Sequence, residues 1–257
     1  MNNESHLHFT GIIPARFASS RFPGKPLVLI GNKSMIQRVY EQASKALGMV
    51  YVATDDKRIF EAVVGFGGKA IMTSPDHMSG TDRCSEAVTT IMDQTGSIID
   101  VVINIQGDEP FIKPEQIISL MECFNDETVE LATIVRETVS GEDLFNPNQP
   151  KVILNSKRDA IYFSRAAIPF IRDTEMRDWS KNHVFYKHLG LYAYRTKTLK
   201  EITQLSRSPL EIAESLEQNR WIENGFRIRT AVTNWESVGI DTPEDLEKAK
   251  KLLDHFF

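Results

Sequence analysis

Short apolar runs alternate with amphipathic stretches through the first half of the chain, and this alternation restricts the fold more than any other feature. The runs Phe9 to Ile13, Met49 to Ala53 and Val101 to Ile105 each have the length of a buried strand. Between the first two, apolar residues recur at helical spacing from Met35 to Leu47. A strand–helix–strand succession builds a parallel sheet with helices on both faces. We therefore predict an α/β fold with a mostly parallel central sheet.

The remaining elements fit one domain of residues 8–257 with a small insertion. From about residue 139 the periodicity weakens and prolines separate short strand-like pieces, so we expect an inserted subdomain at about 139–190 that carries a subunit contact. The other predicted strands are Ala70 to Met72, Val152 to Leu154, Ala160 to Phe163, Leu189 to Tyr194 and Arg227 to Val232. The other predicted helices are Lys57 to Val64, Thr81 to Met92, one around Leu199, Ile212 to Ile222, and a last one that Thr242 caps.

Composition excludes several classes of protein. The net charge of -5 argues against a general nucleic-acid binder, because that function needs a basic surface. The apolar stretches are shorter than the roughly 20 residues of a membrane span, and the N-terminus lacks a charged and then apolar leader. We expect a cytoplasmic protein in which Cys84 and Cys123 are free thiols.

A basic loop follows the first predicted strand. The segment Pro14 to Leu27 carries Arg16, Arg21 and Lys25 among prolines and glycine. Such residues turn backbone N–H groups and positive charges toward a polyphosphate. The segment lacks the Gly-x-x-x-x-Gly-Lys-Ser/Thr pattern of a Walker loop. The alternative is a solvated basic turn without a ligand.

Two carboxylates follow apolar stretches that lie far apart in the chain. Asp108 comes after the run Val101 to Ile105, and Asp241 follows the stretch around Val238 to Ile240. Ligands of parallel sheets collect beyond the carboxyl ends of the strands. Hard oxygen ligands near a triphosphate suit Mg²⁺, which takes one or two carboxylates and keeps several waters. For Asp241 the alternative is a plain strand end before a helix.

These motifs carry a resemblance that extends from about Phe9 to about Leu253. The chain resembles the 3-deoxy-manno-octulosonate cytidylyltransferase family, whose members make CMP-Kdo for lipopolysaccharide. The matching segments, in chain order, are Pro14 to Leu27, Ala53 to Asp56, Asp76 to Arg83, Gln106 to Pro110, Phe145 to Asn148, Phe163 to Ala166, His188 to Tyr192, Ser208 to Glu211 and Gly239 to Leu246.

The resemblance implies a Rossmann-like nucleotidyltransferase that acts as a Mg²⁺-dependent homodimer on CTP and 3-deoxy-D-manno-octulosonate (Kdo). It assigns the CTP phosphates to Arg16, Arg21 and Lys25, and Mg²⁺ to Asp108 and Asp241, so that Lys25 and the two aspartates are the expected catalytic residues. The cytidine would be framed by the segment from Thr73 to Arg83 and read by its backbone, Ser79 and Arg83. The sugar acid would be bound by Gln106, Arg165, His188, Tyr192, Glu211 and Glu214.

Taken from the residues alone, the sugar assignments have simpler alternatives. His188 can be a packing residue, and Tyr192 can belong to a strand face. Glu211 and Glu214 recur at helical spacing, which is typical of a solvated face with ion pairs. Only the resemblance assigns them to the sugar, with His188 as a donor to hydroxyls and Arg165 paired with the carboxylate.

Two other functions compete with cytidylyl transfer to Kdo. One is transfer from another nucleotide, or to a related acceptor such as 8-amino-Kdo. The other is a nucleotide-binding regulator without chemistry. The metal ligands Asp108 and Asp241 disfavour the regulator, because a protein that only binds nucleotide could dispense with them.

Overall fold

The computed structural model describes residues 7–18, 22–138, 141–236 and 239–256. The chain divides into two compact units. Unit 1 comprises Met1–Ile118, Ala193–Thr203 and Ser237–Phe257, and unit 2 comprises Ser119–Tyr192 and Gln204–Glu236. The segment at about 139–190, expected to form an inserted subdomain, lies inside unit 2. Unit 2 is larger because residues on both sides of that segment join it.

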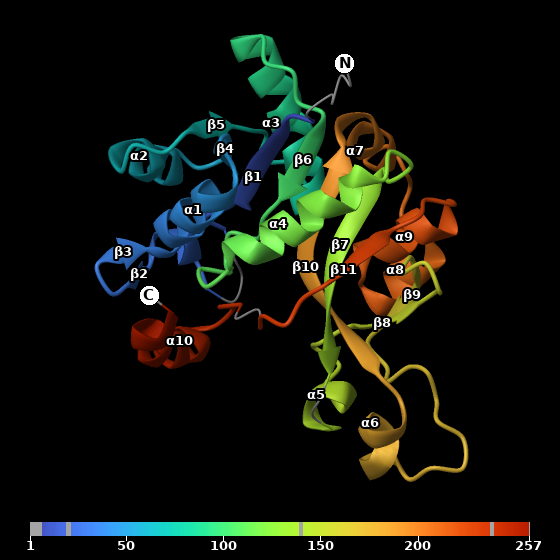
Figure 1. Ribbon diagram of the computed structural model, residues 1–257. Coiled ribbons are helices and arrows are strands. Elements are labelled where there is room, and N and C mark those ends of the chain that lie inside the picture. The colour runs from blue at the N-terminus through green and yellow to red at the C-terminus, as the bar shows by residue number, and fades with distance from the viewer. Residues whose placement is uncertain (1–6, 19–21, 139–140, 237–238, 257) are drawn as a thin grey trace, which may run out of the picture. The chain divides into compact units, whose positions relative to one another are not determined.

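Unit 1 is built on parallel strands in the order β6-β1-β4-β5 (Figure 1). Gly11 of β1 lies opposite Val50 of β4 and Ile103 of β6. These four strands confirm the predicted ones to within two residues, and the side chains of β1, β4 and β6 are mostly buried, as in a sheet covered on both faces, whereas Met72 of β5 is exposed. Their bounds are β1 Phe9–Ala15, β4 Val50–Thr54, β5 Ala70–Met72 and β6 Val101–Asn104.

Helices cover both faces of this sheet. The connections through α1 (Met35–Ala46) and α2 (Lys57–Gly65) step along the sheet in one direction, whereas the connection through α3 (Gly80–Thr95) steps back. Because such crossovers are right-handed, α1 and α2 cover one face and α3 covers the other (Figure 1). α7 (Thr196–Ile202) packs beside α3 and β6. The predicted α/β class with a mostly parallel sheet is confirmed.

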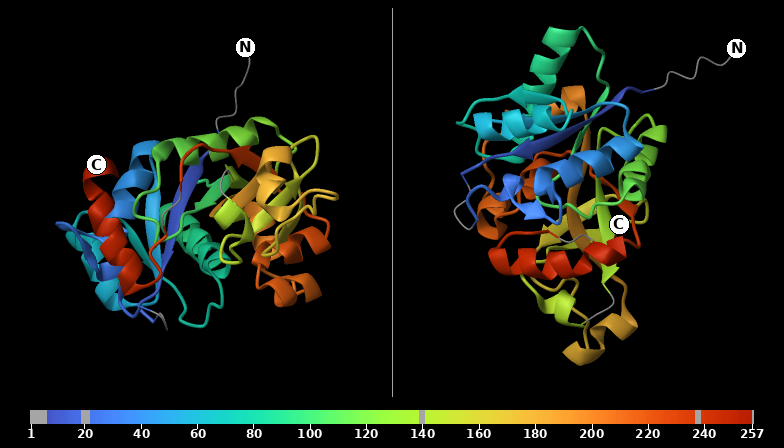
Figure 2. Two further views of the ribbon diagram at one scale, coloured as in Figure 1. Left: turned by 90° about the horizontal axis from the view of Figure 1, so that it is seen from below. Right: turned by 90° about the vertical axis from the view of Figure 1, so that its left-hand side faces the viewer.

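The C-terminal helix α10 (Pro243–Phe256) joins unit 1 through a separate buried cluster. It lies beside the short strand β2 (Leu29–Ile30), which pairs with β3 (Lys33–Ser34) (Figure 2). The cluster brings together Ile30, Met35, Phe111, Ile240, Leu246 and Ala249. Thr242 Oγ1 accepts a hydrogen bond from Asp245 N at 3.2 Å, which confirms the predicted cap. The cluster therefore ties the end of the chain to the segment that follows β6.

Unit 2 holds the parallel pair β7 (Leu131–Thr138) and β11 (Arg229–Val232), with β10 (Phe185–Arg195) next to β7. β8 (Lys151–Leu154) runs antiparallel to both β9 (Ala160–Ser164) and β10. β10 continues into unit 1 at its end, and α4 (Pro114–Glu122) leads out of unit 1. The remaining helices of unit 2 are α5 Gly141–Phe145, α6 Trp179–Asn182, α8 Pro209–Glu214 and α9 Glu217–Glu223, with 3₁₀ turns at Cys123–Asn125 and Met176–Asp178.

Two sequence-based expectations about elements are wrong. The single helix predicted from Ile212 to Ile222 is two helices, because Ser215 adopts a left-handed conformation (φ 52°) and Leu216 is extended. Asp241 does not follow a strand, since Gly239 and Ile240 form an irregular segment before α10. α4 and β7 were not predicted at all. Within the described ranges, no helix is both long and apolar enough to cross a membrane.

We predict that Ile240→Ala lowers the free energy of unfolding by about 2–5 kcal/mol, because it opens a cavity in the cluster under α10. Leu29→Ala is the control, since Leu29 is 59% exposed and its loss should change stability by about 0.5 kcal/mol or less. Urea unfolding measures both variants. Equal stability of the two variants would contradict a buried anchor at Ile240.

Candidate active site

A hollow of about 250 Å³ in unit 1 is lined by residues from the sequence motifs of that unit. It lies where β1 and β6 end, as expected for a parallel sheet. Every site residue predicted in unit 1 lines it, except Arg21, which lies outside the described residues. The lining residues are Pro14, Ala15, Arg16, Lys25, Pro26, His77, Met78, Ser79, Gly80, Arg83, Gln106, Gly107, Asp108 and Asp241.

A glycine allows the two loops at the floor of the hollow to approach each other. A Cβ atom on Gly107 would lie 3.0 Å from the carbonyl oxygen of Pro14, closer than most such contacts. A side chain at this position would push the turn after β6 away from the end of β1 by a few tenths of an ångström. This contact sets where Gln106 and Asp108 emerge.

Lys25 joins the two predicted metal ligands. Its ammonium Nζ lies 2.7 Å from Asp108 Oδ2 and 3.0 Å from Asp241 Oδ1. The Lys25 side chain is only 12% exposed, whereas the carboxylates are 32% and 45% exposed. One positive charge faces two negative charges, so the group keeps a net negative charge at its exposed side. The structure thus brings together residues separated by most of the chain.

The main chain also fixes the spacing between the two carboxylates. Ile240 N donates to Asp108 O at 3.0 Å, and Ile240 itself is fully buried. Asp241 therefore follows a residue that is anchored directly to the Asp108 turn. On the other side, Lys25 begins a 3₁₀ turn after Gly24, whose φ of 72° is the left-handed conformation that glycine favours.

The two carboxylates suit a hard divalent cation that takes only a few of its ligands from the protein. Their oxygens already share one cationic group, Lys25 Nζ, so they converge on a common point. The described residues contain no cluster of three or more His, Cys, Asp or Glu side chains that could hold a metal. Two carboxylates suit Mg²⁺, which binds through one or two of them and completes its shell with water and phosphate. Asp108 and Asp241 would hold such an ion.

The N-terminus of α3 faces the same hollow. Ser79 Oγ accepts from Asp82 N at 3.1 Å, and Asp82 Oδ2 accepts from Ser79 N at 3.2 Å, which makes a capping box. Ser79 and Gly80 line the hollow. Asp82 thus caps the helix that Ser79 begins. The start of this 16-residue helix presents a favourable end for an anion.

The two predicted arginines in this hollow differ in their surroundings. Arg83 is 3% exposed, and its guanidinium donates to Thr73 Oγ1 at 2.5 Å and Asp55 Oδ2 at 3.2 Å. Arg16 is exposed, and the described residues include no hydrogen-bond partner for it. Arg83 is therefore fixed within the protein, whereas Arg16 is able to reorient toward a ligand.

Arg165 and Glu214, both predicted to bind the sugar, form one cluster in unit 2. Glu214 accepts hydrogen bonds from Ser164 Oγ at 2.6 Å, Arg165 N at 2.9 Å and Tyr162 Oη at 3.1 Å. Burial acts to raise the pKa of Glu214, but these hydrogen bonds lower it below its ordinary value. The Arg165 guanidinium donates to the carbonyls of Glu214, Pro147 and Ser215 at 2.7, 2.9 and 3.4 Å. Arg165 is thus held in a defined position by the main chain.

Glu211 has a structural function in this unit. It is 7% exposed and completes a capping box with Ser208 at the start of α8. Its carboxylate also lies 3.6 Å from Arg220 Nε, and Arg220 is 8% exposed. This buried contact joins α8 to α9, so it differs from the solvated ion pair along one helix that the spacing suggested.

His188 and Tyr192 lie on β10, with their rings 5.2 Å apart. His188 Nε2 lies 2.9 Å from Thr133 Oγ1, which in turn donates to Leu191 O at 2.8 Å. With the Thr133 hydroxyl proton donated to Leu191 O, we assign the imidazole proton to Nε2 and the acceptor role to Nδ1. This network does not favour the expected role of His188 as a donor to sugar hydroxyls.

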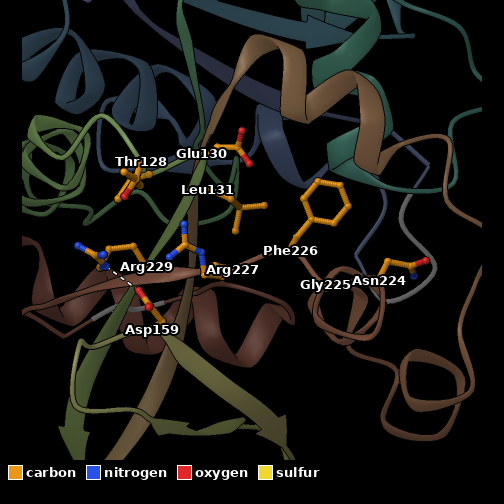
Figure 3. Close-up of a pocket in the computed structure, with 10 residues that line it drawn as sticks. Thr128, Glu130, Leu131, Asp159, Asn224, Gly225, Phe226, Arg227 and Arg229 are labelled. Atoms are coloured by element: carbon orange, nitrogen blue, oxygen red, sulfur yellow. Dashed lines mark hydrogen bonds and ion pairs between the residues drawn. The ribbon is translucent and has the colours of Figure 1, made fainter.

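A second hollow, of about 190 Å³, lies in unit 2 (Figure 3). Arg229 Nε pairs with Asp159 Oδ1 at 2.7 Å, and Arg227 and Glu130 add one charge of each sign. The positive and negative charges of the side chains that line this hollow therefore cancel. Because no predicted site residue lines it, we place the candidate active site in unit 1.

Comparison with known proteins identifies the family. A family model described as cytidylyltransferase matches residues 10–230. A 3-deoxy-manno-octulosonate cytidylyltransferase of Parabacteroides distasonis is 57% identical over 251 residues, which are 96% of this chain and 98% of the relative. The chain belongs to the 3-deoxy-manno-octulosonate cytidylyltransferase family.

Other members and a solved structure agree with this family assignment. An 8-amino-3,8-dideoxy-manno-octulosonate cytidylyltransferase of Shewanella sp. (strain ANA-3) is 47% identical over 252 residues, with 96% of this chain and 99% of the relative covered. A solved CMP:2-keto-3-deoxy-manno-octonic acid synthetase, complexed with CTP, matches with a TM-score of 0.88 and 42% identity. That match covers 97% of this chain and 100% of the solved one. The nucleotidyltransferase fold expected from the sequence is therefore confirmed.

We predict that His188 remains neutral from pH 8 to pH 5. Burial lowers its pKa from the ordinary value of 6.5 to about 3. The unfolded chain then binds one more proton than the folded chain between these two values, so this group reduces stability as the pH falls from about 6.5 toward 3. The measurement is an NMR titration of the His188 ring protons against a histidine-containing peptide. A midpoint near that of the peptide would contradict the lowered pKa of His188.

Proposed function

We propose that this protein transfers the cytidylyl group of CTP to the anomeric hydroxyl of Kdo, giving CMP-Kdo and pyrophosphate for lipopolysaccharide. The observation that carries this proposal is the convergence of Lys25, Asp108 and Asp241 in one hollow beside the start of α3. Relatives 56% and 57% identical over 96% of the chain bear the name of this activity. A nucleotide-binding regulator would need no such pair of metal ligands.

The triphosphate would bind at the charged end of the hollow. Arg16 is free to turn toward phosphate oxygens, and Lys25 can exchange its carboxylate partners for a phosphate while staying in the same hollow. Arg21, from the same basic loop, would assist. Asp108 and Asp241 would hold Mg²⁺, which supplies Lewis-acid stabilisation of the phosphate charge when bound.

The reaction itself needs positioning and charge rather than a covalent intermediate. The anomeric hydroxyl of the sugar acid loses its proton to water and its oxygen attacks the α-phosphorus, the bond from the α-phosphorus to the bridging oxygen of the β-phosphate breaks, and pyrophosphate leaves in line with the attack. Lys25 and Arg16 stabilise the negative charge that develops on the leaving group. Ser79, Arg83 and the backbone between residues 73 and 83 would frame the cytidine.

The family resemblance assigns recognition of the sugar acid to Gln106, Arg165, His188, Tyr192, Glu211 and Glu214. Arg165 is held by three carbonyls at Nε, Nη1 and Nη2, and each Nη retains a further N–H for a carboxylate. His188 would accept a hydrogen bond from a sugar hydroxyl through Nδ1. Glu211, committed to its cap and to Arg220, would act by shaping α8.

A related acceptor is the second candidate. The observation that favours it is the 47% identity to the 8-amino-3,8-dideoxy-manno-octulosonate enzyme. We propose Kdo as the first candidate acceptor because relatives whose names include it are up to 57% identical to this chain. Parallel assays with Kdo and 8-amino-Kdo, each with CTP and Mg²⁺, compare the two acceptors by pyrophosphate release.

We further propose that the enzyme works as a cytoplasmic homodimer. Exposed apolar side chains in unit 2 support a second copy as the partner: Phe170, Met176 and Val184 are 75%, 58% and 51% exposed. Phe170 packs against Trp179 with ring centroids 5.1 Å apart, so the exposed residues extend from a buried aromatic cluster. A net charge of -5 gives no support for nucleic-acid partners.

We predict that the protein releases pyrophosphate when mixed with Mg²⁺, CTP and Kdo, and that Asp108→Asn lowers kcat at least about 100-fold because it removes a carboxylate that would hold the Mg²⁺ ion needed to offset the phosphate charge. Asp93→Asn, at an exposed position near the end of α3, is the matched control and should keep full activity. Circular dichroism checks that both variants are folded. Near-normal turnover by Asp108→Asn would remove the proposed metal role.

We predict that Arg165→Ala raises the KM for Kdo about 10-fold or more while changing the KM for CTP little, because a bidentate partner of the sugar carboxylate is lost. Steady-state kinetics with each substrate varied in turn provides the measurement. An equal rise of both KM values would contradict the assignment of Arg165 to the sugar.

A further inference from the structure

The loop of residues 73–78 forms one side of the hollow in unit 1, and α3 holds it in place. His77 and Met78 of this loop line the hollow. Arg83, on the second turn of α3, donates to Thr73 Oγ1 at 2.5 Å and to Ser74 O at 3.3 Å. The start of the loop is thus fixed from the helix.

Glu86, three residues further along α3, holds the middle of the same loop. Its Oε2 accepts from Ser74 N at 2.9 Å and forms an ion-pair contact with His77 Nε2. One carboxylate oxygen therefore joins two loop residues that are three positions apart. Ser74 Oγ, in turn, accepts from Asp76 N at 3.1 Å, which closes the turn between them.

The charge on Glu86 is maintained by these contacts. Burial acts to raise its pKa, but the hydrogen bonds from Ser74 N and His77, with the nearby charge of Arg83, lower the pKa below its ordinary value. Glu86 therefore stays ionised at neutral pH and acts as an acceptor for both loop groups. Glu86 itself does not line the hollow, so it acts on a ligand only through the loop.

α3 provides a rigid base for these contacts. Its inner face is buried through Thr81, Cys84, Ala87, Val88 and Ile91, and it packs on β1, β4, β5 and β6. The capping box at Ser79 and Asp82 fixes its first turn. Because the helix is set by the core, the positions of Arg83 and Glu86 set the position of the loop.

The charges around the hollow indicate which part of the ligand meets the loop. Arg16, Lys25, Asp108 and Asp241 carry the charges expected to bind phosphate and metal. Arg83, which also lines the hollow, is already bonded to the loop and to Asp55. The loop residues His77 and Met78, which precede the start of α3, are therefore left for the uncharged end of the nucleotide.

We propose that Glu86 is a positioning residue for the nucleobase end of CTP. Through Ser74 and His77 it holds the 73–78 loop at the distance from α3 that admits a pyrimidine. This inference rests on the proposed function, because it takes CTP as the ligand of the hollow. His77 is part of the same contact, although its place in the lining also allows direct contact with the nucleotide.

Glu86→Ala tests the proposal, with Glu86→Gln as the conservative variant. The alanine variant should raise both the KM and the calorimetric Kd for CTP about 10- to 100-fold, as misplacement of a binding group does. Its kcat and its KM for Kdo should stay within about twofold, since the loop does not touch the reacting atoms. The glutamine variant should be intermediate, because its amide oxygen can still accept from Ser74 N. The glutamine variant should also discriminate CTP from UTP less well than the wild-type protein.

Glu61→Ala is the matched control. Glu61 lies on α2, is 62% exposed at its side chain, and pairs with Lys57 at 3.5 Å, so its loss should leave CTP binding unchanged. Unchanged CTP binding by Glu86→Ala would overturn the proposal, and so would a parallel change in kcat and both KM values. Calorimetry with CTP alone separates this test from the proposed function: a wild type that binds CTP but does not use Kdo would contradict the function, and the comparison of variants would still decide the role of Glu86.

Discussion

The ammonium group of Lys25, placed between the carboxylates of Asp108 and Asp241, is the interaction on which the candidate site depends. The three side chains come from a loop after β1, a turn after β6 and the segment before α10. Two carboxylates this close repel each other, and the ammonium offsets that repulsion. A divalent cation can take the place of the Lys25 ammonium between the two carboxylates. The negatively charged triphosphate then becomes the new partner of that ammonium. The same arrangement that stabilises the free protein therefore prepares it for substrate.

The packing of unit 1 explains why these charges meet. Gly107 lets the Asp108 turn lie against the end of β1, and the Ile240 amide bonds to the Asp108 carbonyl. Ile240, Leu246 and their neighbours bury the start of α10 in one apolar cluster. The catalytic geometry is thus a consequence of hydrophobic burial and main-chain hydrogen bonds, and the charged side chains only occupy positions set by them.

Much of this could be predicted from the sequence, because local patterns carry it. The apolar runs located β1, β4, β5 and β6, and the basic loop and Asp108 were placed at strand ends where ligands collect. Asp241 was assigned to the right site for a partly wrong reason: it follows an irregular segment, and a long-range hydrogen bond at Ile240 positions it. β7 was missed although Leu131 to Val135 forms an apolar run, because that run follows a polar stretch.

Other features depend on contacts that no local pattern reveals. Glu86 resembles any charged residue on an amphipathic helix, and only the fold shows that it holds Ser74 and His77. The helix predicted from Ile212 to Ile222 is interrupted at Ser215, whose left-handed conformation has no clear sequence signal. The sequence Ser-x-x-Glu that ends at Glu211 is a capping-box pattern and indicates its capping function. The family resemblance led us to assign Glu211 to sugar binding instead.

The most direct test of the shared cation position is a crystal structure of the protein with CTP and Mn²⁺, analysed by anomalous scattering. The expected result is an anomalous peak coordinated by both Asp108 and Asp241, with the Lys25 ammonium moved from the carboxylates to a phosphate oxygen. A peak bound by neither carboxylate, with Lys25 still between them and the triphosphate elsewhere, would contradict the central role of these three residues.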